Sequence, residues 1–190
     1  MRVLCACEYS QRVCQAFRAM GHESYSADIE PTAGNPEWHI HGDVLDVLGD
    51  PWDMVIAFPP CTHLACSGNR SAPLKIADGR RNAGAAFFLE FTRLEHVKYV
   101  AIENPVGIMS TLYRKPDQII QPWMFGDPYS KRTCLWLKDL PILLPTHNEH
   151  RGEYFESPSG ARMPKWLSHK QFDRSLTFPG IAREMANQWG

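Results

Sequence analysis

A thiol and a carboxylic acid are the two groups in this sequence that could act together in covalent catalysis. Cys61 follows a short apolar run that ends in Pro59 and Pro60, and Glu103 follows a second apolar run over residues 97–102. A thiolate is a good nucleophile, and a carboxyl group whose pKa is raised by burial can donate a proton to the group under attack. Prolines stop a strand abruptly and would present Cys61 on a rigid turn. The pair predicts covalent catalysis with acid assistance.

Simpler readings of the same residues stay open. A free cysteine is more often a small core residue than a nucleophile, and a glutamate after a strand can simply anchor a loop. Cys61, His63 and Cys66 could together bind zinc, but a fourth ligand at a recognisable spacing is missing, so we expect no metal.

The elements that must position these residues alternate between strand and helix. Apolar runs predict strands at residues 3–7, 23–28, 54–58 and 97–102, with a short strand ending at 42–43. Ser10 is expected to cap a helix that ends at Gly21, and a second helix is expected over residues 82–96. Such alternation predicts an α/β fold, Rossmann-like, with a mainly parallel sheet.

The second half of the chain has a different character. Residues 119–125 and 133–137 predict an antiparallel pair at the edge of the sheet, and residues 181–189 predict a closing helix. Residues 66–81 are polar and rich in Gly and Pro, which predicts a loop that could act as a lid or be ordinary surface. Residues 146–175 predict an irregular flap in which basic and aromatic side chains could bind nucleotide or nucleic acid.

Polar residues follow several of the predicted strands. Because the carboxyl ends of parallel strands meet at one edge of a sheet, these residues should share a rim. An acidic residue after the second strand commonly accepts hydrogen bonds from ribose hydroxyls, and Asp28 fits this role. Asp43 could accept from an adenine amino group. The residues on this rim are Glu8–Ser10, Asp28, Asp43, Pro59–Cys61 and Glu103.

In their order along the chain, these segments resemble the S-adenosylmethionine-dependent cytosine C5-methyltransferases, and the compact chain is similar to small phage-borne members. The matching segments are Asp28-Ile29, Gly42-Asp43-Val44, Phe58-Pro59-Pro60-Cys61, Glu103-Asn104-Pro105 and Lys131-Arg132-Thr133, with a weaker match at Pro179–Trp189. The resemblance implies a class I methyltransferase fold in one catalytic domain over residues 1–190. It leaves residues 146–175 in place of a separate target-recognition domain.

The resemblance also implies roles for individual residues. Cys61 would add to C6 of cytosine, Glu103 would engage N3 and the exocyclic amine, and Arg132 would hold O2. The residues implied for S-adenosylmethionine are Glu8, Tyr9, Ser10, Asp28, Ile29, Asp43 and Pro59. The segment Cys5–Ser10 stands where the family has a glycine-rich loop.

Composition limits the partners of the chain. With 190 residues, a formal net charge of −1 and six cysteines without a disulfide-type spacing, we expect one reduced, cytoplasmic domain that has no membrane segment and no broad basic surface. Duplex DNA, single-stranded DNA and a free cytosine nucleotide all stay open as substrates. The alternative functions are a non-catalytic module that binds DNA or protein and, less favoured, a thymidylate-synthase-type enzyme or an N6-adenine methylase.

Overall fold

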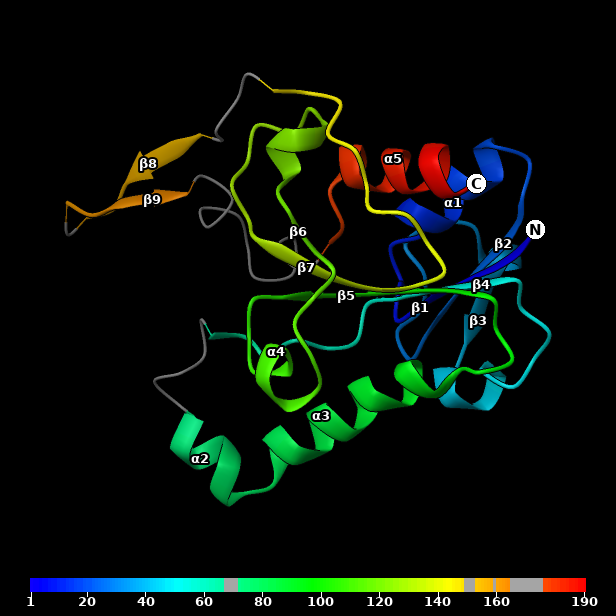
Figure 1. The fold of residues 1–190 in the computed structure, drawn as a ribbon, viewed down its shortest axis with the longest axis horizontal. Coiled ribbons are helices and arrows are strands. Elements are labelled where there is room, and N and C mark those ends of the chain that lie inside the picture. The colour runs from blue at the N-terminus through cyan, green and yellow to red at the C-terminus, as the bar shows by residue number, and fades with distance from the viewer. Residues whose placement is uncertain (67–71, 149–152, 159, 165–175) are drawn as a thin grey trace.

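A seven-stranded sheet forms the centre of the computed structural model, which describes residues 1–66, 72–148, 153–158, 160–164 and 176–190 (Figure 1). The strand order is β3-β2-β1-β4-β5-β7-β6. The first five strands pair in parallel, whereas β7 is antiparallel to both β5 and β6. The strands are β1 (Arg2–Ala6), β2 (Glu23–Asp28), β3 (His39–His41), β4 (Met54–Ala57), β5 (Tyr99–Pro105), β6 (Gln118–Ile120) and β7 (Thr133–Lys138). These findings confirm the predicted α/β class and the antiparallel edge pair.

Helices cover both faces of this sheet (Figure 1). On one face lie α1 (Arg12–Ala19) and α5 (Pro179–Trp189), the predicted closing helix; on the other lie α2 (Ala72–Ala77), α3 (Arg80–Glu90) and α4 (Met109–Leu112). None of the helices in the described ranges has the length and apolar composition needed to cross a lipid bilayer.

The core explains why the apolar runs become strands. All four residues of β4, Met54–Ala57, are buried, as expected for a central parallel strand with helices on both faces. Its side chains alternate between two apolar clusters: Val55 packs in the cluster that contains Phe88 of α3, and Ile56 packs in the cluster that contains Phe17 of α1.

Three local predictions are wrong. Residues 72–77 form α2 rather than a loop. Gly79 (φ 77°), one of the residues behind the loop prediction, lies in the short turn between α2 and α3 and is the N-cap of α3. The N-cap of α1 is Gln11 rather than Ser10. Pro122–Phe125 is a 3-10 turn rather than part of a strand.

The segment at 146–175 is not wholly irregular. It contains a two-stranded hairpin of β8 (Tyr154–Glu156) and β9 (Arg162–Pro164), while the predictions for residues 149–152 and 165–175 lie outside the described residues, as do those for 67–71. The hairpin projects from the body (Figure 1) and is joined to it where Glu153 N donates to Pro128 O at 2.8 Å.

Candidate active site

Four strands bring the predicted site residues to one edge of the sheet. The pairing registers align Ala27, Ala6, Ala57 and Ile102 in a row across the sheet. The residues that follow them therefore occupy the next row, at the carboxyl ends of the parallel strands, and they are Asp28, Cys7, Phe58 and Glu103. This edge is where open α/β sheets bind ligands.

One buried side chain connects the Cys61 turn to the strand that carries Glu103. Asn104 is 1% exposed, and its Nδ2 donates to Pro59 O at 2.7 Å. Pro59 is itself buried. The turn that presents the thiol is thus held against β5 immediately beside Glu103, although the two candidate catalytic residues are far apart in the sequence.

The chain segments that follow these residues also pair with one another. Cys66 N donates to Val106 O and Ile108 N donates to Leu64 O, both at 3.0 Å, and an isolated bridge joins Ala65 to Gly107. We call this pairing of residues 64–66 with 106–108 the seam.

Gly107 is the residue that allows the seam to close. A Cβ at this position would overlap Leu64 O, and it would lie 2.9 Å from Leu64 C and 3.1 Å from Ala65 Cα. These are backbone atoms and cannot rotate away, so the approach requires glycine.

Glu103 has the property that an acid catalyst needs. Burial raises the pKa of its carboxyl group, while the charge of Lys131 and a hydrogen bond from Thr133 partly oppose the shift. A raised pKa keeps a proton on the group at higher pH. Glu103 lies within β5, opposite Leu135 of β7, whereas the sequence predicted that the strand ends before it.

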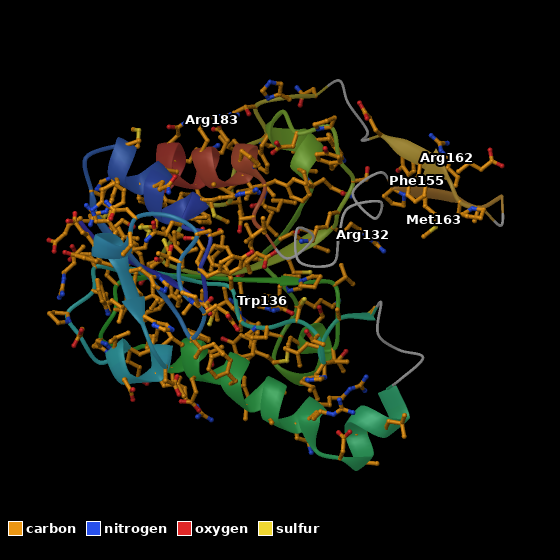
Figure 2. The ribbon with its side chains drawn as sticks, turned by 180° about the vertical axis from the view of Figure 1, so that it is seen from behind. Arg132, Trp136, Phe155, Arg162, Met163 and Arg183 are labelled. Atoms are coloured by element: carbon orange, nitrogen blue, oxygen red, sulfur yellow. The ribbon has the colours of Figure 1, made fainter. Side chains whose placement is uncertain are left out.

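A buried thiol that was not predicted from the sequence, Cys134, pairs with Asn104 on β5, next to Glu103. Burial raises the pKa of Cys134 to about 11; the charge of Glu103 also raises it, and that of Arg132 lowers it. Arg132 is exposed, and Figure 2 shows it on the side from which the hairpin projects. The charge of Lys131 lowers the pKa of Glu103, and the charge of Arg132 lowers the pKa of Cys134. Both basic residues are therefore placed at the Glu103 end of the site.

A second group of residues gathers around the carboxyl ends of β1, β2 and β3. Cys7 N donates to Ala27 O at 2.7 Å, and Gly42 N donates to Asp28 O at 3.0 Å, so hydrogen bonds join the first loop to β2 and β2 to the segment that carries Asp43. Burial raises the pKa of the Cys7 thiol far above its usual range, and the charges of Asp28 and Asp43 add to the shift. Cys7 has φ 59°, the left-handed conformation that glycine adopts most easily. Ile29, which follows Asp28, is 72% exposed.

The three consecutive residues of the first loop have different surroundings. Glu8 is buried, and its carboxylate accepts from Val13 N at 2.7 Å and Cys14 N at 3.1 Å, which caps α1. Burial raises the pKa of Glu8 to about 7. Tyr9 and Ser10 are half-buried, and Tyr9 N donates to Asp28 Oδ2 at 3.1 Å. The loop is therefore attached to the end of β2.

Neither of two hollows that the described residues form is lined by a residue expected to bind the cofactor or to take part in catalysis. One is bordered by Phe91, Arg114 and Trp136, and the other by Arg12 and Arg183 (Figure 2 labels Trp136 and Arg183). Within the described parts of the chain, no three His, Cys, Asp or Glu side chains are placed to hold a metal ion together.

Comparisons with family models and with curated proteins give no match for this chain. The interpretation of the site therefore depends on the residues and geometry described above.

Proposed function

We propose that this protein transfers a methyl group from S-adenosylmethionine to C5 of cytosine through a covalent bond between Cys61 and C6. The observation that carries the proposal is the hydrogen bond from Asn104 to Pro59, which together with the seam holds the Cys61 turn beside Glu103. The mainly parallel sheet with its antiparallel edge pair is also what a class I methyltransferase fold requires.

The proposed chemistry uses the groups in sequence. The Cys61 thiolate adds to C6 while the protonated Glu103 donates to N3, so the electron pair released from the C5–C6 double bond makes C5 nucleophilic. When bound, S-adenosylmethionine would supply the methyl group from its sulfonium to C5 and leave as S-adenosylhomocysteine. C5 then loses its proton to water, and the electron pair of that C–H bond re-forms the double bond and expels the thiolate. The proton on N3 returns to the Glu103 carboxylate. Arg132 binds O2 and stabilises the charge that develops there.

The residues around Cys7 fit the adenosyl part of the cofactor. Asp28 and Asp43 supply carboxylate acceptors for ribose hydroxyls and the adenine amine, and the exposed Ile29 supplies an apolar contact for a planar base. The left-handed backbone at Cys7 gives the first loop a path that a glycine-rich loop would take. In this proposal Pro59 and the first loop, Glu8–Ser10, border the methionine part.

The substrate is cytosine in DNA or in a free nucleotide. In duplex DNA the base must be flipped out, which costs a few kcal/mol and needs contacts to the flanking strand. Within the described residues, the β8–β9 hairpin carries an exposed cation and an exposed aromatic ring that could make such contacts. These are Arg162 and Tyr154, and the Arg162 guanidinium lies 4.2 Å from the centre of the Tyr154 ring. A mononucleotide needs no such contact.

A labelling experiment tests the proposal. The purified protein is incubated with methyl-labelled S-adenosylmethionine and, separately, duplex DNA, single-stranded DNA, RNA and cytidine mononucleotides; label is expected at C5 of cytosine. Cys61→Ala should abolish the transfer. Cys66→Ala is the matched control, because it removes an exposed thiol five residues away but keeps the backbone N–H that Cys66 contributes to the seam, so it should retain the activity.

A second measurement detects the covalent step itself. The wild-type protein should form a denaturation-resistant adduct with 5-fluorocytosine in the same substrate, since fluorine at C5 cannot leave as a proton does, and Cys61→Ala should form none. If no substrate accepts label and no adduct forms, the methyltransferase proposal is wrong, and a non-catalytic binding module takes its place.

A further inference from the structure

The turn that follows β2 has an unusually well-fixed backbone. Asp28 Oδ1 accepts from Glu30 N at 3.0 Å, and Asp28 O accepts from Gly42 N at 3.0 Å. Ile29 lies between these bonded residues with its side chain 72% exposed. A large aliphatic side chain is therefore kept in solvent on a turn that has little freedom to bury it.

Two histidines of the edge strand β3 bind the remaining carbonyls of this turn. His41 Nε2 lies 3.0 Å from Ile29 O, and His39 Nε2 lies 3.0 Å from Glu30 O. Because a carbonyl oxygen can only accept, both Nε2 atoms carry the hydrogen and donate it. The two rings stack with centroids 6.2 Å apart and an angle of 24° between their planes.

His39 is in turn fixed by a buried network. Its Nδ1 lies 2.8 Å from Ser26 Oγ, and Gln11 Nε2 donates to the same oxygen at 3.1 Å. Gln11 also binds both polar groups of the Asn35 backbone, accepting from Asn35 N at 2.7 Å and donating to Asn35 O at 2.9 Å. The network connects the start of α1, the middle of β2 and the loop before β3, and the His39 ring is hydrogen-bonded at both of its nitrogens.

We propose that His39 and His41 are positioning residues that hold the Asp28–Ile29 turn ready for an adenine nucleoside. By fixing the carbonyls of Ile29 and Glu30, they keep the Asp28 carboxylate oriented toward ribose hydroxyls and keep the Ile29 side chain available to the face of the base. Each Asp28 oxygen accepts one amide hydrogen bond and keeps a lone pair for a hydroxyl. The inference rests on the proposed function, since the nucleoside is the adenosyl part of S-adenosylmethionine.

Calorimetric titration with S-adenosylhomocysteine, and separately with adenosine, measures this role. His39→Ala and His41→Ala should each weaken both ligands about three- to tenfold, which is the range expected for loss of one positioning hydrogen bond. His39→Gln and His41→Gln should recover to within about twofold, because the glutamine amide can place an N–H near the position of Nε2. Under saturating cofactor, kcat should stay within about twofold of wild type while KM for the cofactor rises.

His96→Ala is the matched control. Its Nε2 lies 3.0 Å from Leu48 O, which is the same kind of bond at the same length outside this turn. The control should lose comparable thermal stability and keep its affinity for both ligands. If His39→Ala fails to fold, the exposed His41 decides the question alone.

The possible failures can be told apart. Wild-type protein that binds neither ligand overturns the proposed function. If the wild type binds but both alanine variants bind within twofold of it, the positioning role is wrong. A loss of affinity for S-adenosylhomocysteine without a matching loss for adenosine also contradicts the role, since the histidines would then act away from the nucleoside.

Discussion

The hydrogen bond between Asn104 and Pro59 gives the most direct prediction about the site. Asn104→Leu replaces the side chain with an apolar one of similar volume and removes the buried 2.7 Å bond that holds the Cys61 turn. We expect this substitution to lower kcat strongly and to change the free energy of unfolding little. The reason is that Asn104 Nδ2 makes a hydrogen bond, whereas the buried Asn104 Oδ1 makes none with any residue that the structure describes.

The stability change follows from these two atoms. Loss of the donor leaves Pro59 O without its partner in a buried position, which costs about 1–3 kcal/mol. Among the described residues, however, Asn104 Oδ1 is a buried acceptor without a hydrogen-bond partner, and leucine removes that cost, which is of similar size. The free energy of unfolding should therefore change by about 1 kcal/mol or less. In contrast, a displacement of the thiol by about 1 Å should lower kcat about 100-fold.

The assay combines urea unfolding with single-turnover methyl transfer at saturating substrate. Gln118→Leu is the matched control, because Gln118 Nε2 also donates to a backbone carbonyl, Leu143 O, at 2.7 Å, and Gln118 Oε1 accepts from Leu143 N at 2.8 Å. This variant should lose more stability than Asn104→Leu and keep its kcat. If Asn104→Leu keeps kcat within about threefold of wild type, the bond does not position Cys61 and the reasoning is wrong.

Three further predictions concern the same region. Gly107→Ala should separate the seam, since its Cβ would overlap Leu64 O, and should destabilise the fold by about 1–3 kcal/mol, measured by urea unfolding. Glu8→Gln should remove a pH dependence of stability: the pKa of Glu8 rises from 4.5 to about 7 on folding, so the wild type should lose about 3 kcal/mol as pH rises through this interval and nothing more above it. Unfolding curves of both proteins at several pH values check this, and equal slopes would contradict it. Glu103→Gln should lower kcat about 10²- to 10⁴-fold. Because a proton donor must be protonated and burial raises the pKa of Glu103, wild-type activity should persist above the usual pKa of a glutamate and fall as pH rises through the raised value, whereas the pH–rate profile of the variant lacks this step.

The fold could be predicted from the sequence wherever burial alone decides the structure. All four residues of Met54–Ala57 are buried, as in a central parallel strand that is covered on both faces. A continuous apolar run of this kind predicts such a strand directly. The local errors occur where a glycine or proline can either end an element or join two elements, and where a helix begins at a residue outside the usual cap preferences. Gly79 joins two helices. The N-cap position of α1 is Gln11 in a left-handed conformation without a side-chain cap bond, and the free amides of the first turn are bound by the Glu8 carboxylate instead.

The candidate site could be predicted only in part. Cys61 and Glu103 are visible because both follow strong apolar runs, and the topology brings the ends of those runs to one edge. The residues that join them are not visible, because Asn104 and Gly107 act through the backbone of a segment about forty residues earlier in the chain. A single sequence gives no signal that an asparagine or a glycine will contact the backbone of a residue so far away in the chain.

The arrangement also explains why these connecting residues should affect activity more than stability. Glu103 is fixed within a strand that pairs on both sides, with β4 and β7, so its backbone has little freedom. Cys61 lies on a turn outside the sheet, and its position relative to Glu103 depends on the Asn104 bond and the seam. Each of these contacts contributes only about 1 kcal/mol to folding, but catalysis requires the reacting atoms to stay within a fraction of an ångström. The position of Cys61 relative to Glu103 in the proposed site therefore depends on contacts whose loss would leave the protein folded.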